Sequence, residues 1–170
     1  VELTKFPTPG VRTIAALEAA DGGAPADHQI KTMVMVLDGD VTLALVRGDH
    51  QLNLQKLQDG TGAIDIRPAT PEEAKAALGA MPGSLGAVGV EGTRIVADPV
   101  LQGRSGLTTG ANTDDWHYTG VNIERDIAVD EWMDLRDVSE GEACINCGEP
   151  LEIVRCIEAG HIFKLGTKYS

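Results

Sequence analysis

The most hydrophobic run in the chain spans residues 33–37, where no polar side chain interrupts the sequence from Met33 to Leu37. A strand with apolar side chains on both faces must be covered on both sides, so this run predicts a buried strand. The Asp-Gly-Asp turn at 38–40 predicts a hairpin, and residues 41–46, where Val41, Leu43 and Leu45 alternate with Thr42, Ala44 and Val46, predict its return strand. Lys31 stands two positions before the run, at the mouth of the predicted core.

Weaker patterns place the remaining elements. We expect helices over 14–20, 50–58 and 71–78, with N-caps at Thr13, Asp49 and Thr70. A helical turn should follow Asp98-Pro99. Strands are expected over residues 63–66, 94–97, 105–110, 118–121 and 151–155. We expect residues 1–13 to be irregular, residues 126–137 to have mixed structure, and residues 140–148 to form a knuckle. Strands and short helices that alternate irregularly indicate an α/β (α+β) fold: a single compact domain with a mixed β-sheet wrapped by short helices.

Composition narrows the class of protein. The chain has 170 residues, 42% of them hydrophobic, which is enough for one core and a small appendage. The net charge is −12 and the basic residues are scattered, so any contact with nucleic acid is expected to involve a short end or to rely on another domain. No apolar stretch reaches 18 residues, which predicts no membrane span. Three cysteines argue against a disulfide framework and favour the cytoplasm.

The two ends of the sequence also carry an expectation. The chain starts with Val1 and stops abruptly after residues 166–170 (Gly-Thr-Lys-Tyr-Ser). We interpret both ends as cuts within a longer protein.

Three residues are candidates for chemistry, each with a structural alternative. Lys31 either extends its ammonium into water along an apolar stem or presents a fixed positive charge to a pocket at the sheet. Asp98 precedes a proline and can cap a helix, which does not prevent it from lining a pocket. His117 begins a predicted strand after a polar loop, and it is either a half-buried structural histidine or a site residue. No triad of nucleophile, base and orienting group can be assembled.

The cysteines offer a separate hypothesis. Cys144 and Cys147 form a Cys-x-x-Cys pair, and Cys156 with His161 could complete a four-ligand zinc site. The alternative is a pair of ordinary turn cysteines, because one such pair is weak support for a metal site.

A set of short motifs occurs in one order along the chain. They are Thr8-Pro9-Gly10, Ile30-Lys31-Thr32, Val46-Arg47-Gly48-Asp49-His50, Pro82-Gly83-Ser84-Leu85-Gly86, Gly110-Ala111-Asn112, residues 117–122 (His-Tyr-Thr-Gly-Val-Asn), Arg125-Asp126 and Asp134-Leu135-Arg136. In order and spacing this set resembles the insertion (editing) domain of bacterial-type prolyl-tRNA synthetase, which is related to freestanding aminoacyl-tRNA(Pro) deacylases. Residues 160–170 resemble the point where that insertion returns to the catalytic core.

The resemblance implies an aminoacyl-tRNA deacylase fold and a post-transfer editing activity. A proline-sized pocket cannot strongly reject alanine, so the domain would hydrolyse mischarged Ala-tRNA(Pro) as a second sieve. The alternative is a catalytically weak binding module that shapes the synthetase or positions the tRNA 3′ end. Residues 1–137 would be the editing core, and residues 138–170 the knuckle and the return limb.

The resemblance also implies partners, cofactors and location. The partners would be the 3′ aminoacyl end of tRNA(Pro) and the rest of the synthetase, whose full-length form is expected to be a homodimer. We expect no cofactor and no metal for the editing domain, ATP and Mg²⁺ being used by the parent catalytic domain. The protein is expected in the cytoplasm, without membrane contact.

Site residues are carried over by position. Lys31 matches the lysine on which family activity depends, and we expect it to bind the terminal phosphate or to stabilise developing negative charge. Asp98 and His117 match pocket residues, and His117 would limit side-chain size. The remaining substrate-binding candidates are Gly83, Ser84, Leu85, Gly86 and Asn112, most of them in the loop whose backbone N–H groups would hold the ester.

Two departures from the family pattern stand out. The family loop is Gly-x-x-x-Pro, and this chain has Ala87 in place of the proline, which leaves the end of the loop without a fixed φ. Cys156 stands where relatives are expected to have glycine, which weakens the zinc hypothesis. No residue is assigned as general base.

Overall fold

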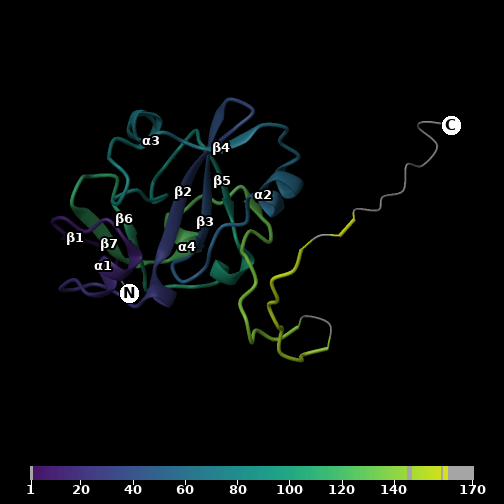
Figure 1. Cartoon of the computed structure of the whole chain (residues 1–170). Helices are drawn as coiled ribbons and strands as arrows, with labels where there is room; N and C mark the ends of the chain where they lie inside the picture. The colour runs from purple at the N-terminus through teal and green to yellow at the C-terminus, as the bar shows by residue number, and fades with distance from the viewer. Residues whose placement is uncertain (1, 145–146, 158, 161–170) are drawn as a thin grey trace. The chain divides into compact units, whose positions relative to one another are not determined.

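The fold is built on one long antiparallel hairpin, seen near the middle of the larger part of the molecule in Figure 1. A computed structural model describes residues 2–144, 147–157, 159 and 160. Strands β2 (Ile30–Leu37) and β3 (Asp40–Arg47) pair along their whole length. The predicted hairpin is confirmed, but its first strand starts at Ile30, so Lys31 lies within β2.

Five strands form a mixed sheet around this hairpin. The additional strands are β4 (Ile66–Pro68), β5 (Arg94–Ala97) and β8 (Glu131–Trp132), in the order β4-β2-β3-β5-β8. Strand β5 runs parallel to β3 and to β8, whereas β4 is antiparallel to β2. The mixed sheet that we predicted is therefore confirmed.

A second, three-stranded antiparallel sheet has the order β1-β7-β6. Its strands are β1 (Thr4–Pro7), β6 (Leu107–Gly110) and β7 (Trp116–Val121). The expectation that residues 1–13 are irregular was wrong, because 4–7 pair with 116–119. Pro7 is tolerated there because β1 is an edge strand, which needs fewer backbone donors.

Two hydrophobic clusters cover opposite faces of the β2–β3 hairpin. Side chains alternate between faces along a strand. Leu43 and Leu45 belong to the larger cluster, which extends to β6, β7 and α3, while Ala44 and Val46 belong to the smaller cluster with Met35. The coverage of both faces that the apolar run predicted is thus confirmed.

Short helices connect and cover the strands. They are α1 (Ile14–Glu18), η1 (Ala26–His28), α2 (Leu54–Thr61), α3 (Pro71–Leu78), η2 (Pro99–Leu101) and α4 (Ile123–Asp126). The predicted caps at Thr13 and Thr70 are confirmed, and Thr70 forms a capping box with Glu73.

Two boundaries in the middle of the chain were predicted wrongly. The helix expected over 50–58 is α2, which starts at Leu54, because the Asn53 side chain, not Asp49, accepts from the backbone N–H of Lys56 at 2.9 Å. The Asp49 carboxylate binds Arg47 instead. The strand expected over 63–66 is β4 at 66–68, because pairing with β2, not local propensity, selects its residues.

The chain divides into two compact units, Val1–Asp137 and Val138–Ser170. In the second unit, Cys144 N–H donates to Glu149 O and Gly148 N–H donates to Cys144 O, so the described residues on the two sides of the expected knuckle are hydrogen-bonded. The strand predicted over 151–155 is absent: none of residues 151–157 belongs to a strand. In the described part of the chain, no helix is long and apolar enough to cross a membrane.

Candidate functional site

A cavity of about 440 Å³ lies at the edge of β2. Its wall comes from segments that are far apart in the sequence, among them α1, β2, the loop after α3, and strands β6 and β7. The lining residues are Arg12, Thr13, Ile14, Leu17, Gln29, Ile30, Lys31, Thr32, Met33, Val34, Pro68, Ala69, Ala74, Pro82, Gly83, Leu85, Thr109, Gly110 and His117. Arg12 and Lys31 bring positive charge, and none of the described residues that line this cavity carries a carboxylate.

The cavity exists because β2 is only partly covered along its outer edge. Strand β4 pairs with residues 35–37 of β2, and the Val34 carbonyl accepts from Ala69 N–H at 2.9 Å. At the other end, the Ile30 carbonyl accepts from Thr109 Oγ1 at 3.3 Å. The backbone N–H and C=O groups of successive residues in a strand point to opposite edges of that strand. Those of Thr32 therefore point to the same edge as the carbonyls of Ile30 and Val34, between these two hydrogen bonds. Polar backbone therefore faces the cavity next to Lys31.

Lys31 is partly buried, and a hydrogen bond holds its ammonium group. Its Nζ donates to the backbone carbonyl of His50 at 2.5 Å. Burial lowers the pKa of Lys31 from its ordinary value of 10.5, and the negative charge of Asp49 opposes that effect. An ammonium has three N–H donors, so this hydrogen bond orients the group while leaving donor capacity for a ligand.

The glycine loop, residues 82–86, forms another wall. Gly83 has a φ of 111°, and a Cβ there would collide with Arg12. A Cβ on Gly86 would collide with the carbonyl oxygen of Gly110, and a Cβ on Gly110 would collide with the loop backbone. Glycine at these positions lets the loop backbone press against β6. The tight approach places Gly83 and Leu85 at the cavity.

The other predicted loop residues support the loop and do not line the cavity. Asn112 clamps Gly86, since its Oδ1 accepts from Gly86 N–H at 2.8 Å and its Nδ2 donates to Gly86 O at 2.9 Å. Ser84 is buried, and its Oγ accepts from Asp115 N–H at 3.1 Å. Ala87, which replaces the expected proline, is fully buried in the larger cluster, so packing holds the end of the loop.

His117 is buried on β7 and lines the cavity. Its Nδ1 lies 2.6 Å from the Thr8 hydroxyl, and Phe6 packs near its ring. Burial lowers the pKa of His117, a hydrogen bond with the Gly83 backbone opposes that shift, and the charge of Arg12 adds to it. The imidazole is thus favoured in its neutral form and fixed between the N-terminal segment and the glycine loop.

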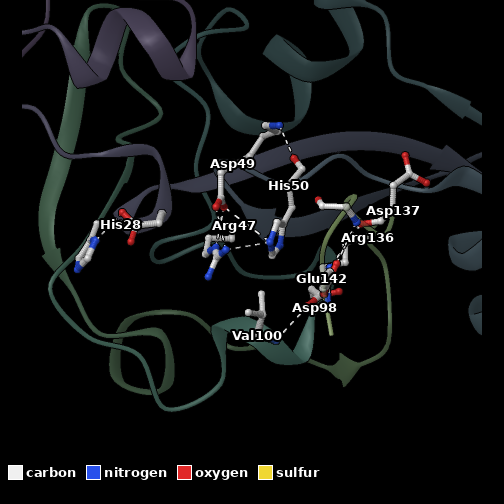
Figure 2. Close-up of polar contacts among 12 residues, drawn as sticks. His28, Arg47, Asp49, His50, Asp98, Val100, Arg136, Asp137 and Glu142 are labelled. Carbon is white, nitrogen blue, oxygen red and sulfur yellow. Dashed lines mark hydrogen bonds and ion pairs between the residues drawn. The ribbon is translucent and has the colours of Figure 1, made fainter. Parts of the chain in front are cut away.

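Asp98 is not among the residues that line the cavity. It is 2% exposed, and its two carboxylate oxygens accept from the backbone N–H groups of Val100 at 3.0 Å and Leu135 at 2.9 Å. Figure 2 shows the Asp98–Val100 contact at the start of η2. Of the two functions considered for this residue, the structure displays the helix cap.

Several cavity residues were not singled out from the sequence. Gln29 donates through Nε2 to the carbonyls of Ile14 and Ala24, at 3.1 and 2.6 Å, which leaves its Oε1 as a buried acceptor without a partner among the described residues. Thr32 Oγ1 is also buried without a hydrogen-bond partner among the described residues. Arg12, which pairs with Asp115 at 2.8 Å, and Leu17 lie at other parts of the wall. Only Thr32 carried a signal, through its place in the Ile30-Lys31-Thr32 motif.

The described part of the chain contains no cluster of metal-binding side chains that would support the zinc hypothesis. Cys144, Cys147 and Cys156 are not joined in a disulfide. His161, the proposed fourth ligand, lies outside the described residues. Among the described residues no three His, Cys, Asp or Glu side chains come together as a metal site.

Comparison with known proteins gives a consistent result. The model of the aminoacyl-tRNA editing domain family matches residues 8–126, which include the cavity residues. The chain is 48% identical over 168 residues to a proline–tRNA ligase of Anaeromyxobacter sp. (strain K), covering 98% of this chain and 29% of that protein. It is 44% identical over 171 residues to the proline–tRNA ligase of Ligilactobacillus salivarius, covering 99% and 30%. The chain thus spans less than a third of the length of these curated relatives.

Solved structures agree on the fold. One, described as a candidate trans-editing enzyme for prolyl-tRNA synthetase, superposes with a TM-score of 0.64 at 25% identity, covering 80% of this chain and 87% of that one. A hypothetical protein gives a TM-score of 0.66 at 20% identity over 81% of this chain and 93% of that one, which supports the fold. The chain therefore belongs to the aminoacyl-tRNA editing domain family and corresponds to the editing region of proline–tRNA ligases.

Proposed function

We propose that this editing domain hydrolyses the ester of mischarged Ala-tRNA(Pro) after transfer. The observation that carries the proposal is the cavity at the edge of β2, where Lys31 and the glycine loop lie beside an apolar wall. A cavity of about 440 Å³ falls in the range typical of small-ligand sites. Its positive charge suits the phosphate of a terminal nucleotide, although the chain as a whole is acidic.

The proposed chemistry relies on positioning and electrostatics. Water adds to the ester carbonyl, the bond to the ribose oxygen breaks, and that oxygen takes up a proton as free alanine leaves. Negative charge develops on the carbonyl oxygen, and preorganised donors stabilise such charge strongly. Lys31 and the backbone N–H groups of Gly83 and Leu85, the two non-proline loop residues that line the cavity, are suitable donors. The neighbouring ribose hydroxyl can help to orient the water, so no protein general base is assigned.

Selectivity would come from the shape of the cavity. The apolar side chains of Ile14 and Leu17 and the ring of His117 limit the room around the amino acid. Discrimination by size alone is modest, about 1–3 kcal/mol for one methylene group. A second sieve of this kind excludes the correct product, Pro-tRNA(Pro), because the larger ring does not fit.

The proposal also assigns functions to the rest of the synthetase. It would supply most of the tRNA affinity, use ATP and Mg²⁺ for charging, act as a homodimer and work in the cytoplasm, while hydrolysis in the editing domain would need no cofactor. Weak tRNA binding by the isolated domain follows from the net charge of −12.

The direct test is deacylation of tRNA(Pro) charged separately with alanine, cysteine and proline. Hydrolysis of Ala-tRNA(Pro) well above the spontaneous rate, with Pro-tRNA(Pro) spared, is the expected result. The cysteine substrate shows how far the small pocket extends to other side chains. If no substrate is hydrolysed faster than in buffer, while the domain still binds the 3′ end of tRNA, the proposal fails in favour of a binding module.

A further inference from the structure

The turn after β3, residues 47–50, is held on several sides. The Arg47 guanidinium donates to both carboxylate oxygens of Asp49, at 2.6 and 2.8 Å, and its Nη2 lies 3.0 Å from His50 Nε2. Figure 2 shows Arg47 beside both Asp49 and His50. Gly48 N–H donates to the Gln29 carbonyl at 2.8 Å, and a Cβ on Gly48 would collide with the backbone of Ala26. The turn has little freedom to move.

Lys31 reaches this turn from the neighbouring strand. Its Cα is opposite Val46 in the β2–β3 register, one residue before the turn begins. The side chain extends along the turn, and Nζ donates to the carbonyl of His50. The His50 side chain is 8% exposed, so burial of the ring fixes the residue whose carbonyl receives the lysine.

We propose that the Arg47–Asp49–His50 turn is a positioning device for Lys31, which it holds at the edge of the cavity as a charged donor. Two interactions of different kinds carry this inference, one a direct hydrogen bond and the other the attraction of a nearby charge. The His50 carbonyl fixes the ammonium in space. The Asp49 carboxylate, kept in place by Arg47, supplies the negative charge that favours the ammonium over the neutral amine. The importance of the turn for hydrolysis depends on the function proposed above, but its effect on Lys31 does not.

The charges around the turn determine the direction of each effect. Asp49 raises the pKa of Lys31 against the effect of burial. Around His50 stand Arg47 and Asp49 from the turn, Asp98 from the end of β5, and Arg136. Replacing Asp49 with asparagine removes the negative charge, so the pKa of Lys31 must fall further. Replacing Arg47 with glutamine removes the two hydrogen bonds that hold the Asp49 carboxylate, so this variant tests whether the fixed position of Asp49 matters.

The experiment measures both the lysine and the reaction. The pKa of Lys31 is followed by NMR titration of its side-chain Cε and Nζ in wild type, Asp49→Asn, Asp49→Glu and Arg47→Gln. Deacylation of Ala-tRNA(Pro) is measured against pH for the same proteins, with spontaneous hydrolysis subtracted. Asp40→Asn is the matched control, because Asp40 is exposed at the opposite end of the same hairpin.

We expect Asp49→Asn to lower the pKa of Lys31, to move the basic limb of the pH profile to lower pH and to slow deacylation roughly tenfold, less than the ~10²-fold that a 1 Å misplacement can cost. Asp49→Glu should restore most of the rate, and Arg47→Gln, which leaves the Asp49 charge but removes its anchor, should slow deacylation by less than Asp49→Asn does. An unchanged Lys31 titration in folded Asp49→Asn overturns the inference. If wild type does not hydrolyse Ala-tRNA(Pro), the proposed function fails, and the NMR titration still decides the role of the turn.

Discussion

Lys31 lies in strand β2, and Asp98 directly follows strand β5. Both are charged residues close to the core, yet they occupy very different environments. Asp98 has both carboxylate oxygens bound to backbone N–H groups, and it is 2% exposed. Among the described residues, the side chain of Lys31 makes one hydrogen bond, to the His50 carbonyl, and Lys31 lines a cavity. A charged side chain whose hydrogen bonds all go to the backbone has a structural role. A charged side chain that lies beside a cavity and still has unused hydrogen-bond donors can act on a ligand.

The two regions therefore respond differently to substitution. Substitution of Asp98 should lower the free energy of unfolding of the domain and leave the activity of the folded molecules unchanged. Changes at the β2 edge should lower activity or selectivity and have smaller effects on stability. The following predictions test that separation.

The largest effect is expected for Lys31→Ala. Removal of one charged donor from an electrostatic site costs about 10²–10³-fold in rate. We expect a loss of that size in Ala-tRNA(Pro) deacylation, with little change in the urea midpoint. Lys75→Ala, which removes the same charge from an exposed position on α3, is the control. Equal rates for Lys31→Ala and wild type would remove Lys31 from the mechanism.

The next effect concerns stability. Asp98→Ala leaves the backbone N–H groups of Val100 and Leu135 without their partner, and each buried unpaired donor costs about 1–3 kcal/mol. We expect urea denaturation to show a loss of roughly 2–4 kcal/mol, while deacylation per folded molecule stays within about twofold of wild type. Asp21→Ala, at an exposed turn, should leave stability unchanged. A folded Asp98→Ala protein without activity would contradict the division between the two regions.

A smaller effect is expected on selectivity. His117→Ala enlarges the cavity where the amino acid is proposed to lie, and steric discrimination in such pockets is worth about 10-fold or somewhat more. The ratio of Pro-tRNA(Pro) to Ala-tRNA(Pro) hydrolysis should therefore rise roughly tenfold. His28→Ala, at an exposed position, serves as the comparison. If the ratio does not change, His117 is not part of the sieve.

The smallest effect is a pH dependence of stability. Burial lowers the pKa of His117, so the unfolded chain binds more protons than the folded one as pH falls through about 6.5 towards the folded-state pKa. Stability is therefore full above pH 6.5 and declines below it, and His50, whose pKa burial also lowers, adds to the decline. Urea titrations near pH 7 and pH 5 should show a smaller decline in His117→Gln than in His28→Gln. Equal declines would place the effect elsewhere.

Sequence reasoning located the elements with strong local signals and missed those that depend on pairing. The β2–β3 hairpin and the Thr70 cap follow from an unbroken apolar run, a turn pair and a capping box. Strand β1 was missed because its short sequence becomes a strand only through pairing with β7. Helix α2 was placed four residues too early, because Asp49 and Asn53 are both competent caps and the ion pair with Arg47 occupies Asp49.

At the candidate site the sequence by itself determined the family, the glycine loop and the importance assigned to Lys31, because these depend on residue identity and order. Only the tertiary structure decided which candidates line the cavity, namely Lys31, Gly83, Leu85 and His117, and which support its walls, namely Ser84, Gly86 and Asn112. The physical reason is that a cavity wall forms from segments distant in sequence. The hydrogen bond from Lys31 to His50 and the paired oxygens of Asp98 exist only once the folded chain has brought those segments together.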